Sequence, residues 1–475
     1  MTSSTLDARW GARLWGALTV LCAVIFLDAL DVSMVGVALP SIQADLGMTT
    51  SSLQWVVSGY VLGYGGLLLL GGRTADLLGR RRVFLAALVV FAVASLLGGL
   101  MSDGTLLVAA RFLKGMSAAF TAPAALSIIT TTFAEGPARN RALSIFTACG
   151  ASGFSLGLVL SGLLTEVGWR WTFLMPVPVA LIALVAGVRL LARDRERGEG
   201  GHDLPGALTV TGAMLLLVFA VVEAPKVSVV QTVASLAGSA VLLGLFVWIE
   251  RRVRHPLVRL GILRSAPLVR ANIGLVILFG SYVGFQFVAM QYFQNLLGWS
   301  ALQTAVAFLP AGLLVALSST RMGRLADRFG TGRLIVLGSV ALLAGYAMFF
   351  RVDRHPSLLG MVIPGMVLLG IAFGLSFPSL NIQAVAGVPD SEQGLASGLL
   401  NTSGQVGGAV VLAIVTAVLT AGDGDGDPIS RFRAAITVSA VFALVGLVVA
   451  LTGLRSRRAP AAVAVESEER ALEAA

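Results

Sequence analysis

Stretches of about twenty apolar residues recur along almost the whole of this 475-residue chain. A run of that length spans the ~30 Å hydrocarbon core of a bilayer as a single helix. The composition agrees with this interpretation, because 56% of the residues are hydrophobic, only 12% are charged and the mean hydropathy is +0.88. A soluble domain of this size does not have such a composition. The sequence therefore predicts an all-α integral membrane protein that crosses the bilayer many times.

Counting one crossing for each apolar run predicts fourteen transmembrane helices. They are expected near residues 14–39, 53–71, 83–101, 105–130, 142–165, 171–192, 206–224, 229–250, 268–294, 302–320, 333–351, 357–381, 393–420 and 431–454. With the N-terminus inside, 26 of the 34 basic residues fall on the cytoplasmic side and six on the opposite side. Because basic residues are retained on the inner side of membranes, both termini are predicted to be cytoplasmic.

Two acidic and two basic residues lie well inside the apolar runs, away from the ends. Of the 25 acidic residues, only Asp28 and Asp31 lie well within a predicted span, and the fourth span contains Arg111 and Lys114. A charge at the bilayer centre costs at least ~2.5 kcal/mol on insertion scales, so intramembrane charges usually mark a transport pathway. The spacing of three residues within each pair places its two members on one face of their helix.

The depths of these four charges predict how they pair. At ~1.5 Å per residue, Asp31 and Arg111 lie roughly 12 and 9 Å below the same membrane surface. Asp28 and Lys114 lie roughly 17 and 14 Å below it. We therefore expect one ion pair between Asp31 and Arg111 and a second between Asp28 and Lys114. The alternative for each is a static buried pair with no role in transport.

A repeated loop indicates that the chain consists of two related halves. Identical residues recur at an offset of 251 positions, among them Gly72, Arg73, Asp76 and Gly79 in the first copy and Gly323, Arg324, Asp327 and Gly330 in the second. With Arg80, these residues are expected to form cytoplasmic latches that hold one conformation, although Arg80 to Arg82 can equally be topology anchors. The offset fits six spans plus an inserted pair. The predicted organisation is a six-helix bundle at 1–194, a central linker with two extra transmembrane helices at 195–265, a second six-helix bundle at 266–455 and a disordered cytoplasmic tail at 456–475.

Several motifs resemble one transporter family. The segment Leu30 to Pro40 looks like its first-span motif, with Gly36 where Asn is usual, and Arg111 to Gly115 looks like its fourth-span motif, with Lys114 in place of Gln. In span 5, Gly153, Gly157 and Gly162 resemble the antiporter motif, although Leu158 replaces its Pro. Together with the repeated loop, these segments resemble the fourteen-spanning drug:proton antiporters of the major facilitator superfamily.

This resemblance implies the major facilitator fold and proton-coupled efflux of an amphipathic drug, antibiotic or natural product by alternating access. It implies a monomer in the plasma membrane of a prokaryote whose partners are a small substrate, protons and the lipid bilayer, with no nucleic acid. No cofactor is expected, because the proton gradient drives transport. Asp31, opposite Arg111, is the expected protonation switch, and Asp28 with Lys114 is expected to tune the substrate charge.

Polar and aromatic residues in both halves are candidates for the substrate cavity. They are Tyr60, Tyr64, Phe285, Gln286, Phe287, Gln291, Asn381, Asn401 and Gln405. Phe285 and Phe287 are two positions apart and so do not share a helix face. Each residue has ordinary interhelical hydrogen bonding or lipid contact as its alternative role.

Other functions compete with drug efflux to different degrees. A metabolite or lipid exporter, or an importer, requires only the same fold, whereas a non-transporting membrane sensor or scaffold leaves the repeated loops and paired charges unexplained. An enzyme is not expected, because no phosphate-binding glycine motif with a lysine and no His/Cys/acid cluster is present. The same absence of ligand clusters predicts no metal site.

Overall fold

The structure is a computed structural model that describes residues 10–134, 137–192, 203–223, 227–253, 256, 258, 260–319, 322–388, 393–420 and 427–455, except some side chains within helices. Regular structure in these residues is entirely helical. The α-helices are α1 (Ala12–Leu46), α2 (Thr50–Leu78), α3 (Arg80–Leu100), α4 (Gly104–Thr132), α5 (Pro137–Val167), α6 (Trp171–Leu174), α7 (Pro176–Leu190), α8 (Leu204–Glu223), α9 (Val229–Glu250), α10 (Ala266–Met290), α11 (Ala301–Ser319), α12 (Met322–Phe329), α13 (Thr331–Phe349), α14 (Ile363–Val385), α15 (Gln393–Thr420) and α16 (Pro428–Arg455). A 3₁₀ turn (Leu260–Arg264) precedes α10, and π-helical turns extend α10 (Gln291–Leu296) and precede α14 (Leu358–Val362).

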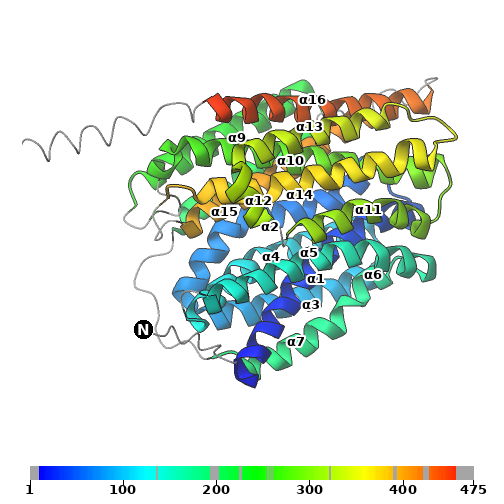
Figure 1. Ribbon diagram of the computed structural model, residues 1–475. Helices are drawn as coiled ribbons and strands as arrows, with labels where there is room; N and C mark the ends of the chain where they lie inside the picture. Colours follow the sequence, from blue (N-terminus) through cyan, green and yellow to red (C-terminus); the bar gives the residue numbers. More distant parts are fainter. Residues whose placement is uncertain are drawn as a thin grey trace, which may run out of the picture.

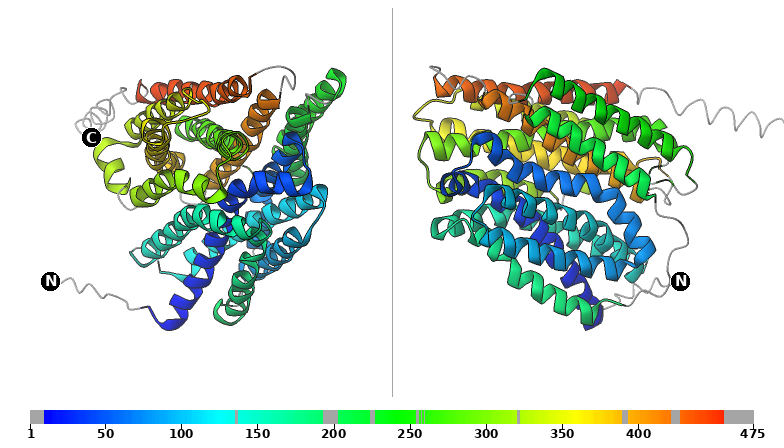
Figure 2. Two further views of the ribbon diagram at one scale, coloured as in Figure 1. Left: turned by 90° about the vertical axis from the view of Figure 1, so that its right-hand side faces the viewer. Right: turned by 180° about the vertical axis from the view of Figure 1, so that it is seen from behind.

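The helices form two bundles that lie side by side (Figures 1 and 2). In the first bundle, α1 packs on α5 and α7, and α4 packs on α2 and α3. In the second, α10 packs on α15 and α16, and α13 packs on α14. The bundles meet where α2 packs on α15, α5 on α11 and α1 on α10. The pair α8 and α9 contacts both bundles, since α8 packs on α2 and on α15.

Each of the fourteen apolar runs coincides with a helix, or with two consecutive short helices in the case of α6 and α7. Among the described residues, twelve helices are long and apolar enough to cross a membrane. That set does not include α2 or α8, and α8 contributes only a shorter apolar stretch at Pro205–Leu217. The count of fourteen spans therefore stays a prediction, and the proposed tail at 456–475 lies outside the described residues.

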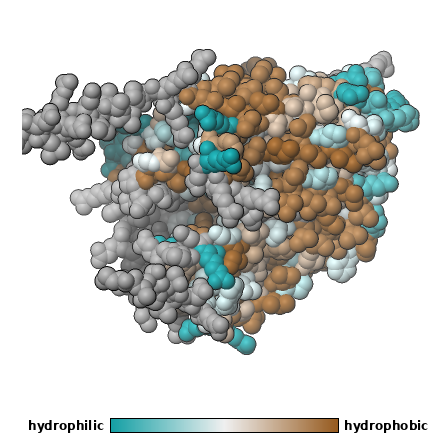
Figure 3. All heavy atoms as spheres, viewed as in Figure 1, coloured by the Kyte–Doolittle hydropathy of each residue, from teal (hydrophilic) through white to brown (hydrophobic). Residues whose placement is uncertain are grey.

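The outer surface of the bundles is apolar. Large hydrophobic side chains such as Leu337 and Val340 on α13 and Val441, Leu444 and Val448 on α16 are about half exposed. Figure 3 shows apolar residues over much of this face, with hydrophilic ones gathered toward the helix ends. An exposed apolar surface of this extent is typical of contact with lipid. Inside, the largest cluster of buried apolar side chains continues from α1 and α2 into the second bundle.

Candidate functional site

Three charged side chains from α1 and α4 form a buried cluster beside the junction of the two bundles. Asp31 is 0% exposed, and the nearby Arg111 and Lys114 are 2% and 0% exposed. One carboxylate oxygen of Asp31 accepts a hydrogen bond from Arg111 and the other accepts one from Lys114. A single carboxylate therefore bridges two cations. The predicted pair of Asp31 and Arg111 is present, and Lys114 joins it.

Other groups complete the surroundings of the two cations. Nε of Arg111 donates to the carbonyl oxygen of Val56, 2.9 Å away, and the guanidinium lies 4.6 Å from the ring centroid of Tyr60. Nζ of Lys114 lies 4.8 Å from the ring centroid of Phe91 and 5.2 Å from that of Phe173. Aromatic faces attract cations by ~0.5–2 kcal/mol each. These contacts partly replace the hydration that the buried charges lose.

The expected ion pair between Asp28 and Lys114 is wrong. Asp28 is 6% exposed, its Oδ2 accepts a hydrogen bond of 3.0 Å from the hydroxyl of Thr121, and its Oδ1 has no partner among the described residues. Side chains tilt toward the N-terminus of their own helix, and α1 and α4 run in opposite directions. Lys114 therefore leans toward Asp31, whereas Asp28 leans toward Thr121. The sequence signal for Thr121 was its position seven residues, about two turns, beyond Lys114 on one helix face.

A small cavity of about 50 Å³ lies between the bundles and borders the charge cluster. Its lining comes from α1, α2, α4, α10 and α15 and includes four of the predicted substrate residues, namely Tyr60, Gln286, Phe287 and Gln405, together with Arg111. Sites that enclose drug-sized ligands are larger, ~300–1,000 Å³. Binding such a molecule here therefore requires the two bundles to move apart.

The other predicted cavity residues have different environments. Phe285 is fully buried within the second bundle against Tyr346 and Phe349. Asn381 and Asn401 donate to carbonyl oxygens of their own helices, at Phe377 and Ser397. Tyr64 is half-buried with its ring centroid 6.1 Å from that of Tyr60, and Gln291 lies at the far end of α10. None of these five belongs to the described cavity lining. Phe279 and Met290 also line the cavity, but as apolar residues in an apolar run they could not be recognised from the sequence.

Hydrogen bonds of amide side chains connect α1 to the end of α10. The side-chain oxygen of Gln43 accepts hydrogen bonds from Gln291, at 3.4 Å, and from Asn295, at 3.2 Å. Gln294 donates to the carbonyl oxygen of Val37 at 2.9 Å. These bonds join the two bundles at the end of the molecule where α1 terminates. The clustering of three amides within five residues, 291–295, was the sequence signal that could have indicated this contact.

The glycines predicted in α5 lie at close helix contacts. A Cβ at Gly153 would meet the carbonyl oxygen of Phe26 at 2.5 Å, and one at Gly157 would meet that of Leu30 at 2.8 Å, so both glycines face α1. Gly162 faces the second bundle, where an added Cβ would lie 2.9 Å from Cα of Leu302 on α11. Small residues permit such close packing of helices in membranes.

Adding one methyl group at Gly157 is expected to destabilise the protein, because its Cβ would lie 2.8 and 3.0 Å from the carbonyl oxygen and Cα of Leu30, which are backbone atoms of α1 and cannot move aside cheaply. The same Cβ would lie closer still to the side-chain oxygen of Ser33. Overpacking of this kind costs ~1–3 kcal/mol. Gly150→Ala is the matched control, since a Cβ there meets only a side-chain carbon of Ile25 at 3.4 Å. Thermal unfolding of the purified variants should show a clear loss for Gly157→Ala and almost none for Gly150→Ala. Equal melting temperatures would contradict this account of the contact between α1 and α5.

The repeated loops share a backbone conformation. Gly79 directly precedes α3 with φ of 100°, and Gly330 directly precedes α13 with φ of 78°. Residues with a Cβ rarely adopt such angles, which explains a glycine at this position in both copies. Gly72 packs near Pro123, and Arg80 begins α3. The side chains of Arg73, Asp76, Arg324 and Asp327, and Gly323, lie outside the described residues, so the latch stays a prediction.

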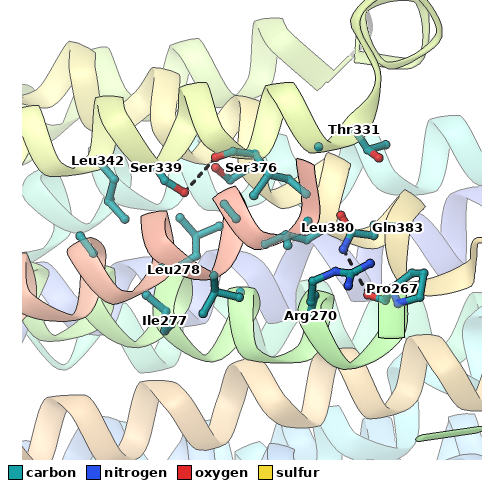
Figure 4. A pocket seen from close by; sticks show the side chains of 18 of the residues that line it. Pro267, Arg270, Ile277, Leu278, Thr331, Ser339, Leu342, Ser376, Leu380 and Gln383 are labelled. Atoms are coloured by element: carbon teal, nitrogen blue, oxygen red, sulfur yellow. Dashed lines mark hydrogen bonds between the residues drawn. The ribbon is translucent and has the colours of Figure 1, made fainter. Parts of the chain in front are cut away.

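A second cavity, of about 90 Å³, lies inside the second bundle. Figure 4 shows Arg270, Ser339, Ser376 and Gln383 around it, with the side chain of Gln383 donating to the carbonyl oxygen of Pro267. This cavity is larger than the central one, but its lining comes from the second bundle alone and includes none of Asp28, Asp31, Arg111 and Lys114. We therefore assign the functional site to the central cavity.

Buried charges beside a cavity at the junction of two helical bundles are the pattern of a membrane transporter. Residues 21–412 and 322–474 match the family model of the Major Facilitator Superfamily, which identifies the family. The chain belongs to this superfamily. As a multi-pass transporter of the Major Facilitator Superfamily it is not an enzyme, and it works without a cofactor.

Relatives with assigned roles are bacterial drug resistance and export proteins. The chain is 40% identical over 420 residues to the puromycin resistance protein pur8 of Streptomyces alboniger, covering 86% of this chain and 82% of that one. It is 37% identical over 413 residues to the cephamycin export protein CmcT of Amycolatopsis lactamdurans, covering 86% and 85%. In fold it is similar to the crystal structure of the POT family transporter PepTSo, with a TM-score of 0.66 at 16% identity, covering 92% of this chain and 98% of that one.

Proposed function

We propose that this major facilitator transporter exports an amphipathic drug, antibiotic or natural product across the plasma membrane of a bacterium in exchange for protons. The observation that carries the proposal is the cluster of Asp31, Arg111 and Lys114, together with Asp28, beside the cavity between the bundles. Buried charges at this position respond both to a proton and to a ligand in the cavity. The similarity to puromycin and cephamycin resistance and export proteins supports an antibiotic-like substrate.

Fourteen transmembrane helices and cytoplasmic termini are part of this proposal. The distribution of basic residues supports that orientation, and it places the contact of Gln43 with Gln291 and Asn295 on the outer side. The bonds at this end then close the cavity toward the outside. Alternating access requires them to break when the bundles rock about the central cavity. Because α8 packs on both α2 and α15, its contacts with at least one bundle must also rearrange when the bundles rock.

Everted membrane vesicles with an acidic interior provide the test. An exporter in this orientation should accumulate labelled puromycin or another antibiotic of a chosen panel several-fold, and collapse of the pH gradient with nigericin should remove the accumulation. Vesicles without the protein are the control. Accumulation that survives nigericin would contradict proton coupling, and substrate loss from preloaded vesicles would indicate an importer instead.

A further inference from the structure

We infer that the substrate site selects uncharged or anionic amphiphiles and disfavours permanent cations. This inference rests on the proposed export function and specifies its substrate class. Among the described residues, the lining of the central cavity contains the cation Arg111 and the amides Gln286 and Gln405, and it contains no carboxylate. A cationic substrate inside the cavity would therefore meet like charge at the wall.

The amide of Gln286 gives the lining a hydrogen-bond donor that has no acceptor in the part of the chain that the structure describes. Its side chain is 9% exposed and its Nε2 is buried. This nitrogen borders Gly36, where an added Cβ would lie only 3.2 Å away. A buried unsatisfied donor is costly, so a ligand gains by offering an oxygen such as a carbonyl. The donor favours neutral and anionic compounds that carry acceptors.

The summed charge of the four buried side chains beside the cavity also disfavours cations, whether or not Asp28 is protonated. Arg111 and Lys114 contribute two positive charges, and Asp31, held between them, contributes one negative charge. The four buried side chains then sum to zero when Asp28 is ionised and to one positive charge when Asp28 is protonated. Their sum is not negative in either case. A cation therefore gains no net attraction from this cluster, whereas an anion is attracted whenever Asp28 carries a proton.

Three dansyl amides of similar size separate charge from shape. The neutral probe carries an N-butyl group, the anionic probe an N-(3-carboxypropyl) group and the cationic probe an N-(2-trimethylammonioethyl) group. Binding to the purified full chain in nanodiscs can be followed by energy transfer from tryptophan, with empty nanodiscs subtracted. We expect the neutral and anionic probes to bind at least about tenfold more tightly than the cationic one, which corresponds to ~1.4 kcal/mol.

Adding a carboxylate to the lining should reverse this preference. Gln286→Glu and, in case that variant does not fold, Gln405→Glu each place an acid at the cavity and should bring the cationic probe to equal or tighter binding. Asn381→Asp is the matched control, because Asn381 lies outside the described lining and bonds within its own helix. It should leave the preference unchanged.

Other results in these binding measurements would overturn the inference. Cation binding by the wild type as tight as that of the neutral probe would do so, as would an unchanged preference in both glutamate variants. Failure of all three probes to bind would reject the central cavity as an amphiphile site. These binding measurements need no gradient, so their failure is distinct from that of proton-coupled export. Export that is insensitive to nigericin would defeat proton coupling and leave the charge preference intact.

Discussion

Asp31→Asn is expected to abolish gradient-driven export and to lower the stability of the folded protein by several kcal/mol. Asp31 is the bridging acceptor of Arg111 and Lys114, and the three side chains are at most 2% exposed. Removing the carboxylate leaves two buried cations without the acceptor that bridges them, and breaking a buried ion pair from one side costs ~3–5 kcal/mol. Thermal unfolding of the purified variant and antibiotic uptake by everted vesicles measure the two effects.

Two further variants distinguish the electrostatic cost of removing Asp31 from a general loss of stability. Asp31→Asn combined with Lys114→Met removes one of the two stranded cations, so it should recover part of the lost stability without recovering export. Asp45→Asn is the exposed counterpart, since the ion pair of Asp45 with Arg170 at 2.6 Å has side chains 46% and 39% exposed. Such surface pairs contribute ~0–1 kcal/mol. If Asp31→Asn melted like the wild type, the cluster would not hold α1 to α4 in the way described.

Most of the helices, but few of the side-chain partners, could be predicted from the sequence. Apolar runs of about twenty residues identify helices because the bilayer fixes their length, and they located the helices that bear Asp31 and Arg111. The repeat at Gly79 and Gly330 was visible because both sites need positive φ, which is a local property. Pairing was less predictable, because counting residues along a helix axis ignores the direction in which each side chain tilts.

Side chains that face a cavity cannot be told from those that pack within a bundle by residue type alone. Phe287 lines the central cavity, whereas Phe285 packs among Tyr346 and Phe349 inside the second bundle. The difference depends on the rotation of α10, which is set by contacts with α15 and α16 from more than a hundred residues away. The contact of Gln43 with Asn295 has the same non-local origin. Such contacts follow from tertiary packing and leave no periodic pattern in one segment.

Asp28→Asn is expected to uncouple transport from the proton gradient while leaving the protein folded. The two intramembrane acids have different partners: Asp31 contacts two cations, whereas Asp28 accepts one hydrogen bond from Thr121 and its second oxygen has no partner within the described segments. Of the two acids, Asp28 is therefore the one whose charge is not stabilised by an ion pair among the described residues. Asparagine can still accept the bond from Thr121 through its carbonyl oxygen, so the change in stability should be within about 1 kcal/mol.

Two transport assays distinguish lost coupling from lost transport. Uptake driven by a pH gradient should fall to the background level in Asp28→Asn, whereas exchange of labelled for unlabelled substrate without a gradient should continue, because rocking of the bundles does not need net proton movement. Asp28→Glu retains an acid and should restore part of the gradient-driven uptake. Normal gradient-driven uptake by Asp28→Asn, or equal loss of exchange and uptake, would remove Asp28 as the proton carrier. In that case the proton would have to act at Asp31 itself, by breaking its contacts with Arg111 and Lys114.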